Sequence, residues 1–129
     1  LTLGTGAQEL FLDGNGGSLR ATIGSDKMWV CEVRVLARVV SPGGGTVATR
    51  DIYAATYKCV IANKSGTTAL VGTVQADMAA QFDANMATAT FTIAADNTND
   101  ALTVTYNPGA LEDGTTQVNV YATIFYNEF

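Results

Sequence analysis

The clearest hydrophobic pattern in the chain covers residues 28–40. Every odd position of this stretch carries a non-polar side chain, whereas its three charges, Glu32, Arg34 and Arg38, occupy even positions. A period of two is the repeat of a β-strand, in which successive side chains point to opposite faces. The stretch is therefore predicted to be a long strand with one face in a hydrophobic core.

Shorter stretches with the same alternation follow along most of the chain. Clusters of Gly, Asn, Asp and Ser separate them, and these residue types favour turns. Residues 74–86 show no clear period, so a helical turn and a loop crossing between sheets both remain open there. The other predicted strands cover residues 9–13, 18–23, 47–62, 67–73, 88–95, 102–106 and 117–127.

About eight strands without a convincing long helix predict an all-β fold, an antiparallel β-sandwich of jelly-roll type. The length of 129 residues suits one domain with one core. We assign that domain to residues 9–129 and treat residues 1–8 as a linker or loosely ordered end. We also expect residues 9–13 and 18–23 to pair as a hairpin, and residues 63–66 to form a type I turn.

The two cysteines, Cys31 and Cys59, fall on the core-facing positions of the two longest predicted strands. If the hairpin between these strands closes tightly, with Val40 opposite Val47, Cys31 lies opposite Thr56. A wider loop aligns the two cysteines instead. We expect two buried free thiols, because burial is the common state of lone cysteines, and keep a cross-strand disulfide as the alternative.

The charge balance narrows the classes of partner. The net charge is −5, and the seven Lys and Arg residues are scattered rather than gathered in a basic stripe, which argues against binding to nucleic acid. No run of about 18 apolar residues is present, so we expect no membrane insertion, and no secretory signal is recognisable. Because the first residue is Leu1 rather than Met, we expect a fragment of a longer polypeptide.

Candidate chemistry is sparse. The chain lacks histidine, which excludes Ser-His and Cys-His catalysis as well as histidine metal sites. The carboxylate pairs Asp96 with Asp100 and Glu112 with Asp113 lie in predicted loops, where acids are normally solvated rather than tuned for catalysis. Residues 96–100 alternate oxygen-bearing side chains as a calcium loop does, but an Asx-type turn is the simpler interpretation. We therefore expect no enzyme activity, no cofactor and no metal.

Hydrophobic residues also occupy the predicted outward face of the long strands. A monomer exposes such side chains to water, whereas an oligomer covers them, so we predict a subunit interface on this face. Aromatic residues in the strands could instead line a sugar-binding face, but we favour roles in the core and in the subunit interface for them. The predicted interface residues are Met28, Val30, Leu36, Val40 and Phe125, and the strand aromatics are Tyr53, Tyr57, Tyr106, Tyr121, Phe125 and Tyr126.

A series of short segments follows in order from residue 9. It comprises residues 9–14 (ELFLDG), the long strand around Trp29, residues 55–58 (ATYK), 61–66 (IANKSG), 68–73 (TALVGT) and 94–104 (AADNTNDALTV), and a closing strand. This series resembles the β-rich module at the C-terminal ends of tailed-bacteriophage structural proteins such as tail fibres and tailspikes. In that family the closing strand often carries a Trp, where this chain has Tyr121.

The resemblance implies a non-enzymatic virion structural domain, a homotrimer at the distal end of a fibre or spike. Its role would be to lock the trimer, to bind the host surface, or both. Proteins of this kind fold in the bacterial cytoplasm before they assemble into the virion, which agrees with unpaired thiols. The implied partners are the rest of a phage fibre, spike or capsid and a host surface glycan.

Exposed turns are where host contact is expected, because loops carry most binding residues. Two alternatives remain open: a capsid decoration or head-fibre protein that binds the phage shell, and a carbohydrate-binding module of a secreted enzyme. The candidate surface-binding residues are Gly43, Gly44, Asn63, Lys64, Asn97, Asn99, Leu111 and Glu112.

Overall fold

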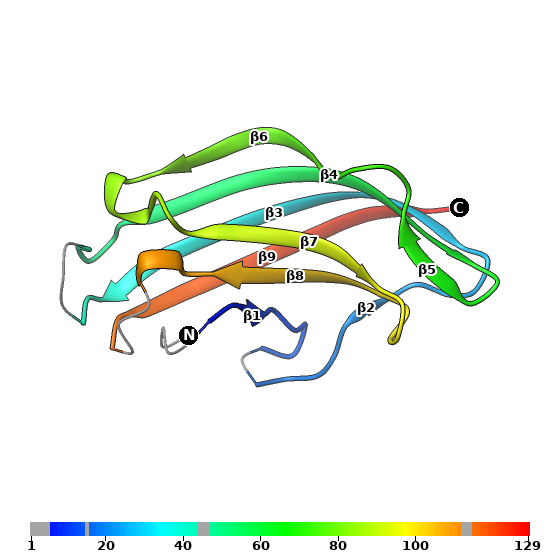
Figure 1. Ribbon diagram of the computed structural model, residues 1–129, viewed down its shortest axis with the longest axis horizontal. Helices are drawn as coiled ribbons and strands as arrows, with labels where there is room; N and C mark the ends of the chain where they lie inside the picture. The colour runs from blue at the N-terminus through cyan, green and yellow to red at the C-terminus, as the bar shows by residue number, and fades with distance from the viewer. Residues whose placement is uncertain (1–5, 15, 44–46, 112–114) are drawn as a thin grey trace.

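The computed structural model describes residues 6–14, 16–43, 47–111 and 115–129. Two antiparallel sheets pack face to face along the long axis of the molecule (Figure 1), so the predicted all-β sandwich is confirmed. Two single-turn 3-10 helices, η1 (Ala84–Met86) and η2 (Gly109–Leu111), connect strands. The strands are β1 (Gln8–Glu9), β2 (Ala21–Thr22), β3 (Met28–Ser41), β4 (Ile52–Lys64), β5 (Thr67–Leu70), β6 (Gln75–Phe82), β7 (Thr90–Asp96), β8 (Ala101–Asn107) and β9 (Gln117–Glu128).

The larger sheet is built on β3 and β4. Strand β3 pairs with β4 on one side and with β9 on the other, while β5 and β6 share the second edge of β4. In the smaller sheet β8 is central, with β7 along one edge and both β1 and β2 along the other. Strand β9 is therefore an edge strand, since no strand of the described chain pairs with its second edge.

The core lies between the sheets and follows the predicted period of two. The inward side chains of β3, from Trp29 to Val39, are at most 4 % exposed. From the smaller sheet, the Phe91 ring lies 5.5 Å from the Tyr53 ring and 5.0 Å from the Tyr106 ring, measured between centroids. Burying a large apolar side chain contributes about 1.5–3 kcal/mol, so this shared layer is the main source of stability.

The hairpin predicted between residues 9–13 and 18–23 is wrong in its pairing. Among the described residues, one backbone hydrogen bond, from Leu12 N to Leu19 O (2.8 Å), joins the two segments. The strands found in this part of the chain, β1 and β2, do not pair with each other, and each pairs with β8 instead. The carboxylate of Asp13 accepts the backbone N–H groups of Ser18 and Leu19 at 3.2 and 3.1 Å, so a side chain takes donors that a hairpin ladder would use.

Residues 74–86, which showed no period, form β6 and then η1. The helical turn left open for this segment occurs only at η1, where the chain crosses from the larger sheet to the smaller one, and most of the segment is a strand. Strand β6 is almost entirely exposed, so its sequence carries no alternation between a core face and a water face. Its backbone pairs with β4 through two irregularities in the register. Met86 at the end of η1 is fully buried, and this anchor explains how the segment is held.

The hairpin between β3 and β4 closes through the wider of the two loops considered. Val39 N donates to Asp51 O, and Arg50 N donates to Val39 O, both at 2.9 Å. Val39 therefore faces residues 50–51, and the tight closure at Val47 does not occur. In the resulting register Cys31 lies directly opposite Cys59, and both are free thiols, as expected.

The turn between β4 and β5 has two residues, because Lys64 pairs directly with Thr67. Ser65 and Gly66 both have positive φ, 52° and 82°. Positive φ at both central residues defines a type I′ turn, the tight hairpin turn that matches the twist of paired strands. The predicted type I turn is therefore wrong, although Gly66 does occupy a left-handed position as expected.

Candidate functional site

The face of the larger sheet that points away from the core carries the predicted interface residues. Backbone hydrogen bonds of 3.1 and 2.9 Å pair Met28 with Phe129, and Leu36 lies opposite Tyr121, so these side chains share one face. We define the outer apolar strip as Met28, Val30, Leu36, Val40, Tyr121, Phe125 and Phe129.

The outer apolar strip is largely open to water. Val30 and Val40 are each 44 % exposed and Phe125 is 50 % exposed, whereas Leu36 is only partly exposed. The predicted orientation of the outward side chains of β3 and β9 is thus confirmed. Tyr121 and Phe129, which are not among the predicted interface residues, lie on the same face.

A shallow depression of about 800 Å³ lies within this face. Its apolar lining comes from Val30, Val60, Val71, Ile124, Phe125 and Tyr126, together with the two cysteines, Cys31 and Cys59. A mixture of apolar and polar lining residues is common in protein interfaces. The polar lining residues are Glu32, Lys58, Thr73, Gln75 and Asn127.

Two of the cations on this face form ion pairs within the chain, whereas the exposed Arg38, between Leu36 and Val40 on β3, forms none with a described residue. Arg34 Nε lies 2.7 Å from Glu32 Oε1, and the Arg34 guanidinium lies 4.8 Å from the Phe125 ring centroid. Lys58 Nζ lies 2.8 Å from Asp77 Oδ1, and this hydrogen bond raises the pKa of Lys58. The face therefore offers few uncompensated charges to a partner.

A second hollow, a groove of about 340 Å³, lies between β9, β8 and residues 9–14. Its only cation among the described lining residues, Arg20, is already paired with Glu9 at 2.8 and 2.9 Å and stacks 4.8 Å over the Phe11 ring. The hydrogen bonds to Glu9 raise the pKa of Arg20. The groove therefore has polar and apolar lining in similar parts, and its cation is already neutralised, so its described lining offers no free charge to an anionic ligand.

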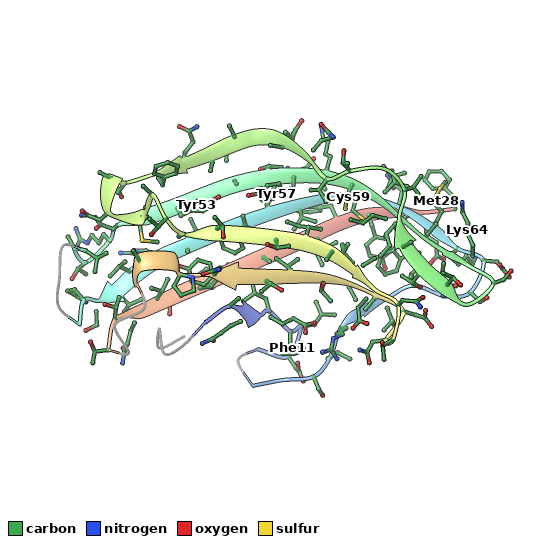
Figure 2. All side chains as sticks on the ribbon, in the orientation of Figure 1. Phe11, Met28, Tyr53, Tyr57, Cys59 and Lys64 are labelled. Atoms are coloured by element: carbon green, nitrogen blue, oxygen red, sulfur yellow. The ribbon has the colours of Figure 1, made fainter. Side chains whose placement is uncertain are left out.

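Asn63, a candidate surface-binding residue, is 2 % exposed. Its Nδ2 donates to Ile23 O at 3.4 Å, and its Oδ1 accepts the Gly66 N–H at 2.9 Å. The prediction that Asn63 contacts a host surface is therefore wrong, because its amide fixes the β4–β5 turn from inside. Its neighbour Lys64 is exposed at the same end of the molecule as Met28 (Figure 2).

The loop after β7 is held by its own side chains. Asp96 Oδ1 accepts the N–H groups of Thr98 and Asn99 at 2.8 and 3.2 Å, and Asn99 Nδ2 donates to Asp96 Oδ2 at 2.6 Å. The Asn99 side-chain hydrogen bond is the main cause of the lowered pKa of Asp96. Asn97 Oδ1 accepts the Thr68 N–H at 2.6 Å, which ties this loop to β5. The predicted Asx-type turn is confirmed.

The candidate loops occupy opposite ends of the sandwich. The β4–β5 and β7–β8 turns, with Lys64, Asn97 and Asn99, lie at one end, and Gly43 and η2, which ends at Leu111, lie at the other (Figure 1). Gly43 is exposed, and its N–H donates to Thr116 Oγ1 at 3.0 Å. The other two candidates, Gly44 and Glu112, lie outside the described residues. The eight candidates therefore do not form one continuous surface.

The strand aromatics divide between core and surface. Tyr53 and Tyr106 are buried, Tyr57 is partly buried, and burial raises the pKa of Tyr106 to about 12. The aromatics of β9 are exposed instead: Tyr121, Phe125 and Tyr126. Of these, Tyr126 stacks on Trp29 with the ring centroids 4.2 Å apart. The predicted core role is confirmed for Tyr53 and Tyr106.

Groups of three or more metal-ligating side chains are absent from the described residues. Within the same residues, no helix is long and apolar enough to span a membrane. No protein-family model, curated protein or solved structure matches this chain at a significant level.

Proposed function

We propose that this chain is a non-enzymatic virion structural domain from the C-terminal end of a phage tail fibre or tailspike. In this proposal it forms a homotrimer through the outer apolar strip and presents loops to a host surface glycan. The resemblance of its segment series to such modules supports the phage assignment. The observation that carries the assembly role is the exposed outer apolar strip.

The strip is difficult to explain in an isolated monomer. Scattered exposed apolar residues are ordinary, but adjacent ones on neighbouring strands form a patch of the kind that partners cover. Here Met28 is paired with Phe129, and Leu36 with Tyr121, across β3 and β9. Covering this strip with a second subunit removes apolar surface from water, which favours association at about 25 cal/mol per Å² of apolar area before its costs are counted.

The charges on the same face favour this role as well. An unpaired charge buried at an interface is costly because it loses its water. Arg34 with Glu32 and Lys58 with Asp77 already form ion pairs, so a partner covers compensated groups. Arg38 on the same face of β3 is exposed, so contact between copies has to leave it in water or offer it an acidic group of the neighbour.

In this proposal, the host glycan binds at the end of the sandwich that carries the β4–β5 and β7–β8 turns. Lys64, Asn97 and Asn99 are exposed there. Three copies held together turn weak single contacts into stronger overall binding by raising the effective concentration. A capsid decoration protein would use the same strip against the phage shell, and it would then be a monomer when purified alone.

Measurement of the mass in solution tests the assembly role. Light scattering after size-exclusion chromatography should give three times the 13.5 kDa chain mass. Val30→Glu places a charge in the strip and should yield a folded monomer. Leu12→Glu is the matched control, because Leu12 is 62 % exposed and lies outside the strip, and it should remain trimeric. A monomeric parent chain, or a Val30→Glu variant that stays trimeric, contradicts the proposed interface.

The attachment role needs a separate measurement. A glycan array probed with the trimer should show binding that weakens strongly when Val30→Glu makes the chain monomeric, because each single contact is weak. Lys64→Glu should weaken binding without changing the mass. Equal glycan affinity of monomer and trimer would instead indicate a carbohydrate-binding module.

A further inference from the structure

Cys31 and Cys59 face each other across the two central strands of the larger sheet. Directly opposed residues in an antiparallel pair have Cα atoms about 4.5–5.5 Å apart. Disulfides span Cα separations of about 4.4–6.8 Å. The register therefore brings the two thiols within bonding range without any movement of the backbone.

The side chains also contact each other in the reduced state. A hydrogen bond joins the Cys31 and Cys59 thiols, and it lowers the pKa of Cys59 while it raises the pKa of Cys31. The thiolate is the reactive form of cysteine, so the lowered pKa favours Cys59 as the first sulfur to react.

Access limits which oxidant can reach the pair. Cys31 is 2 % and Cys59 is 6 % exposed, and their side chains point into the core between the sheets. Cys59 lies on the central part of β4 (Figure 2). Thiols this deeply buried react through local opening of the sheet, and a small oxidant needs less opening than a bulky disulfide does.

We propose that Cys31 and Cys59 are a paired oxidation site, which hydrogen peroxide converts into an intrachain disulfide. The Cys59 thiolate attacks one peroxide oxygen, the O–O bond breaks, and hydroxide leaves, so that Cys59 becomes a sulfenic acid. The Cys31 sulfur then attacks the Cys59 sulfur, the S–O bond breaks, and water leaves with the Cys31 proton. In total, two thiols and one peroxide give one disulfide and two waters.

The bond links β3 to β4 and closes the loop of residues 32–58. Such a link restricts the unfolded chain far more than the folded one, because the native register already holds the two residues together. The oxidised domain should therefore resist unfolding better than the reduced domain. This inference concerns the reduced and oxidised states of one chain, so it does not depend on the proposed phage function.

Mass spectrometry after peroxide treatment tests the proposal. The protein is exposed to dilute hydrogen peroxide, quenched with catalase, unfolded in denaturant and alkylated with N-ethylmaleimide. We expect the loss of two hydrogens, no alkylation, and a linked peptide pair that contains Cys31 and Cys59. Two alkylated thiols, sulfinic or sulfonic acids, or chains linked to one another would each overturn the proposal.

Thermal unfolding provides a second readout on the same samples. The oxidised protein should unfold at a higher temperature than the reduced protein, and dithiothreitol should remove the difference. Cys31→Ala and Cys59→Ala serve as matched controls, because each leaves one thiol and should show no gain with peroxide. A cross-linked protein that unfolds at a lower temperature would overturn the claim that the native register is already aligned for the bond.

Discussion

The side chain of Tyr106 is fully buried, and its hydroxyl has no hydrogen-bond partner among the described residues. An unsatisfied buried polar group costs about 1–3 kcal/mol of stability. Phenylalanine keeps the ring, which packs 5.0 Å from the Phe91 ring, and removes only the hydroxyl. Tyr106→Phe should therefore raise the free energy of unfolding by about 1–2 kcal/mol, whereas most core substitutions lower it.

Urea denaturation measures this change, and the thermal midpoint should rise by about 3–6 °C per kcal/mol for a domain of this size. Tyr53→Phe is the matched control, because the Tyr53 hydroxyl lies 3.4 Å from the Tyr57 hydroxyl. Its removal should leave stability unchanged or lower it. A Tyr106→Phe variant that is less stable than the parent would refute the reasoning, because it would show that the hydroxyl has a partner.

The pH dependence of the same variant gives an independent check. Burial raises the pKa of Tyr106 from 10.0 to about 12, so the folded state holds this proton more tightly than the unfolded state. The resulting contribution to stability is complete below pH 10.0 and is lost as the pH rises toward about 12. Tyr106→Phe should remove this component, which has a slope of up to about 1.4 kcal/mol per pH unit.

Two further substitutions test contacts made by Thr68 and Gly109, and a change of pH tests the carboxylate of Asp96. Thr68→Val should cost about 1–3 kcal/mol, because the buried hydroxyl donates to Asp100 Oδ1 at 2.7 Å. Gly109→Ala should cost more than 1 kcal/mol, because φ is 61° and a Cβ would collide with the Thr88 carbonyl oxygen. Hydrogen bonds from Asn99 and Thr98 hold the pKa of Asp96 below the usual value of an aspartate. Lowering the pH through this pKa should weaken stability, because the folded state favours the ionised form.

Chemical denaturation measures the free energy of unfolding in all three tests. Each test has a matched control in the same chain. Thr67→Val changes an exposed threonine beside Thr68 and should have little effect. Gly24→Ala meets one side-chain atom at 3.5 Å, an ordinary contact, and should be tolerated. Asp96→Asn should flatten the acid loss of stability. Equal effects of each substitution and its control would show that the cited contacts do not carry the stability.

Alternation along the chain was sufficient to predict which side chains enter the core. The odd residues of β3 from Trp29 to Val39 and the rings of Phe91 and Tyr106 are buried as the period of two requires. The outward direction of Val30 and Phe125 followed from the same rule. These predictions succeed because side-chain direction in a strand is a local property, set by the backbone of consecutive residues.

Pairing between distant segments was decided by the tertiary structure. Whether Cys31 faces Cys59 or Thr56 depends on where the β3–β4 loop closes. Directly opposed residues point to the same face, so the Thr56 register would turn the odd residues of β4 away from the core, whereas the observed register puts Cys31 opposite Cys59 with both side chains inside. The partner of β1 is β8 rather than residues 18–23, because backbone hydrogen bonds of an open sheet edge carry no side-chain signature. The exposed edge strand β6 was missed for the same reason.

Contacts between distant segments also decided which candidate loop residues are buried and which are exposed. Asn63 and Lys64 are neighbours with the turn composition of an exposed loop, yet one is buried and the other is open to water. Burial of Asn63 requires Ile23 to lie beside it, and no local pattern predicts that contact. The sequence thus determined the sheets and their two faces, because these depend on local periodicity. Register, edge partners and the polar contacts of the turns were decided only when distant segments packed together.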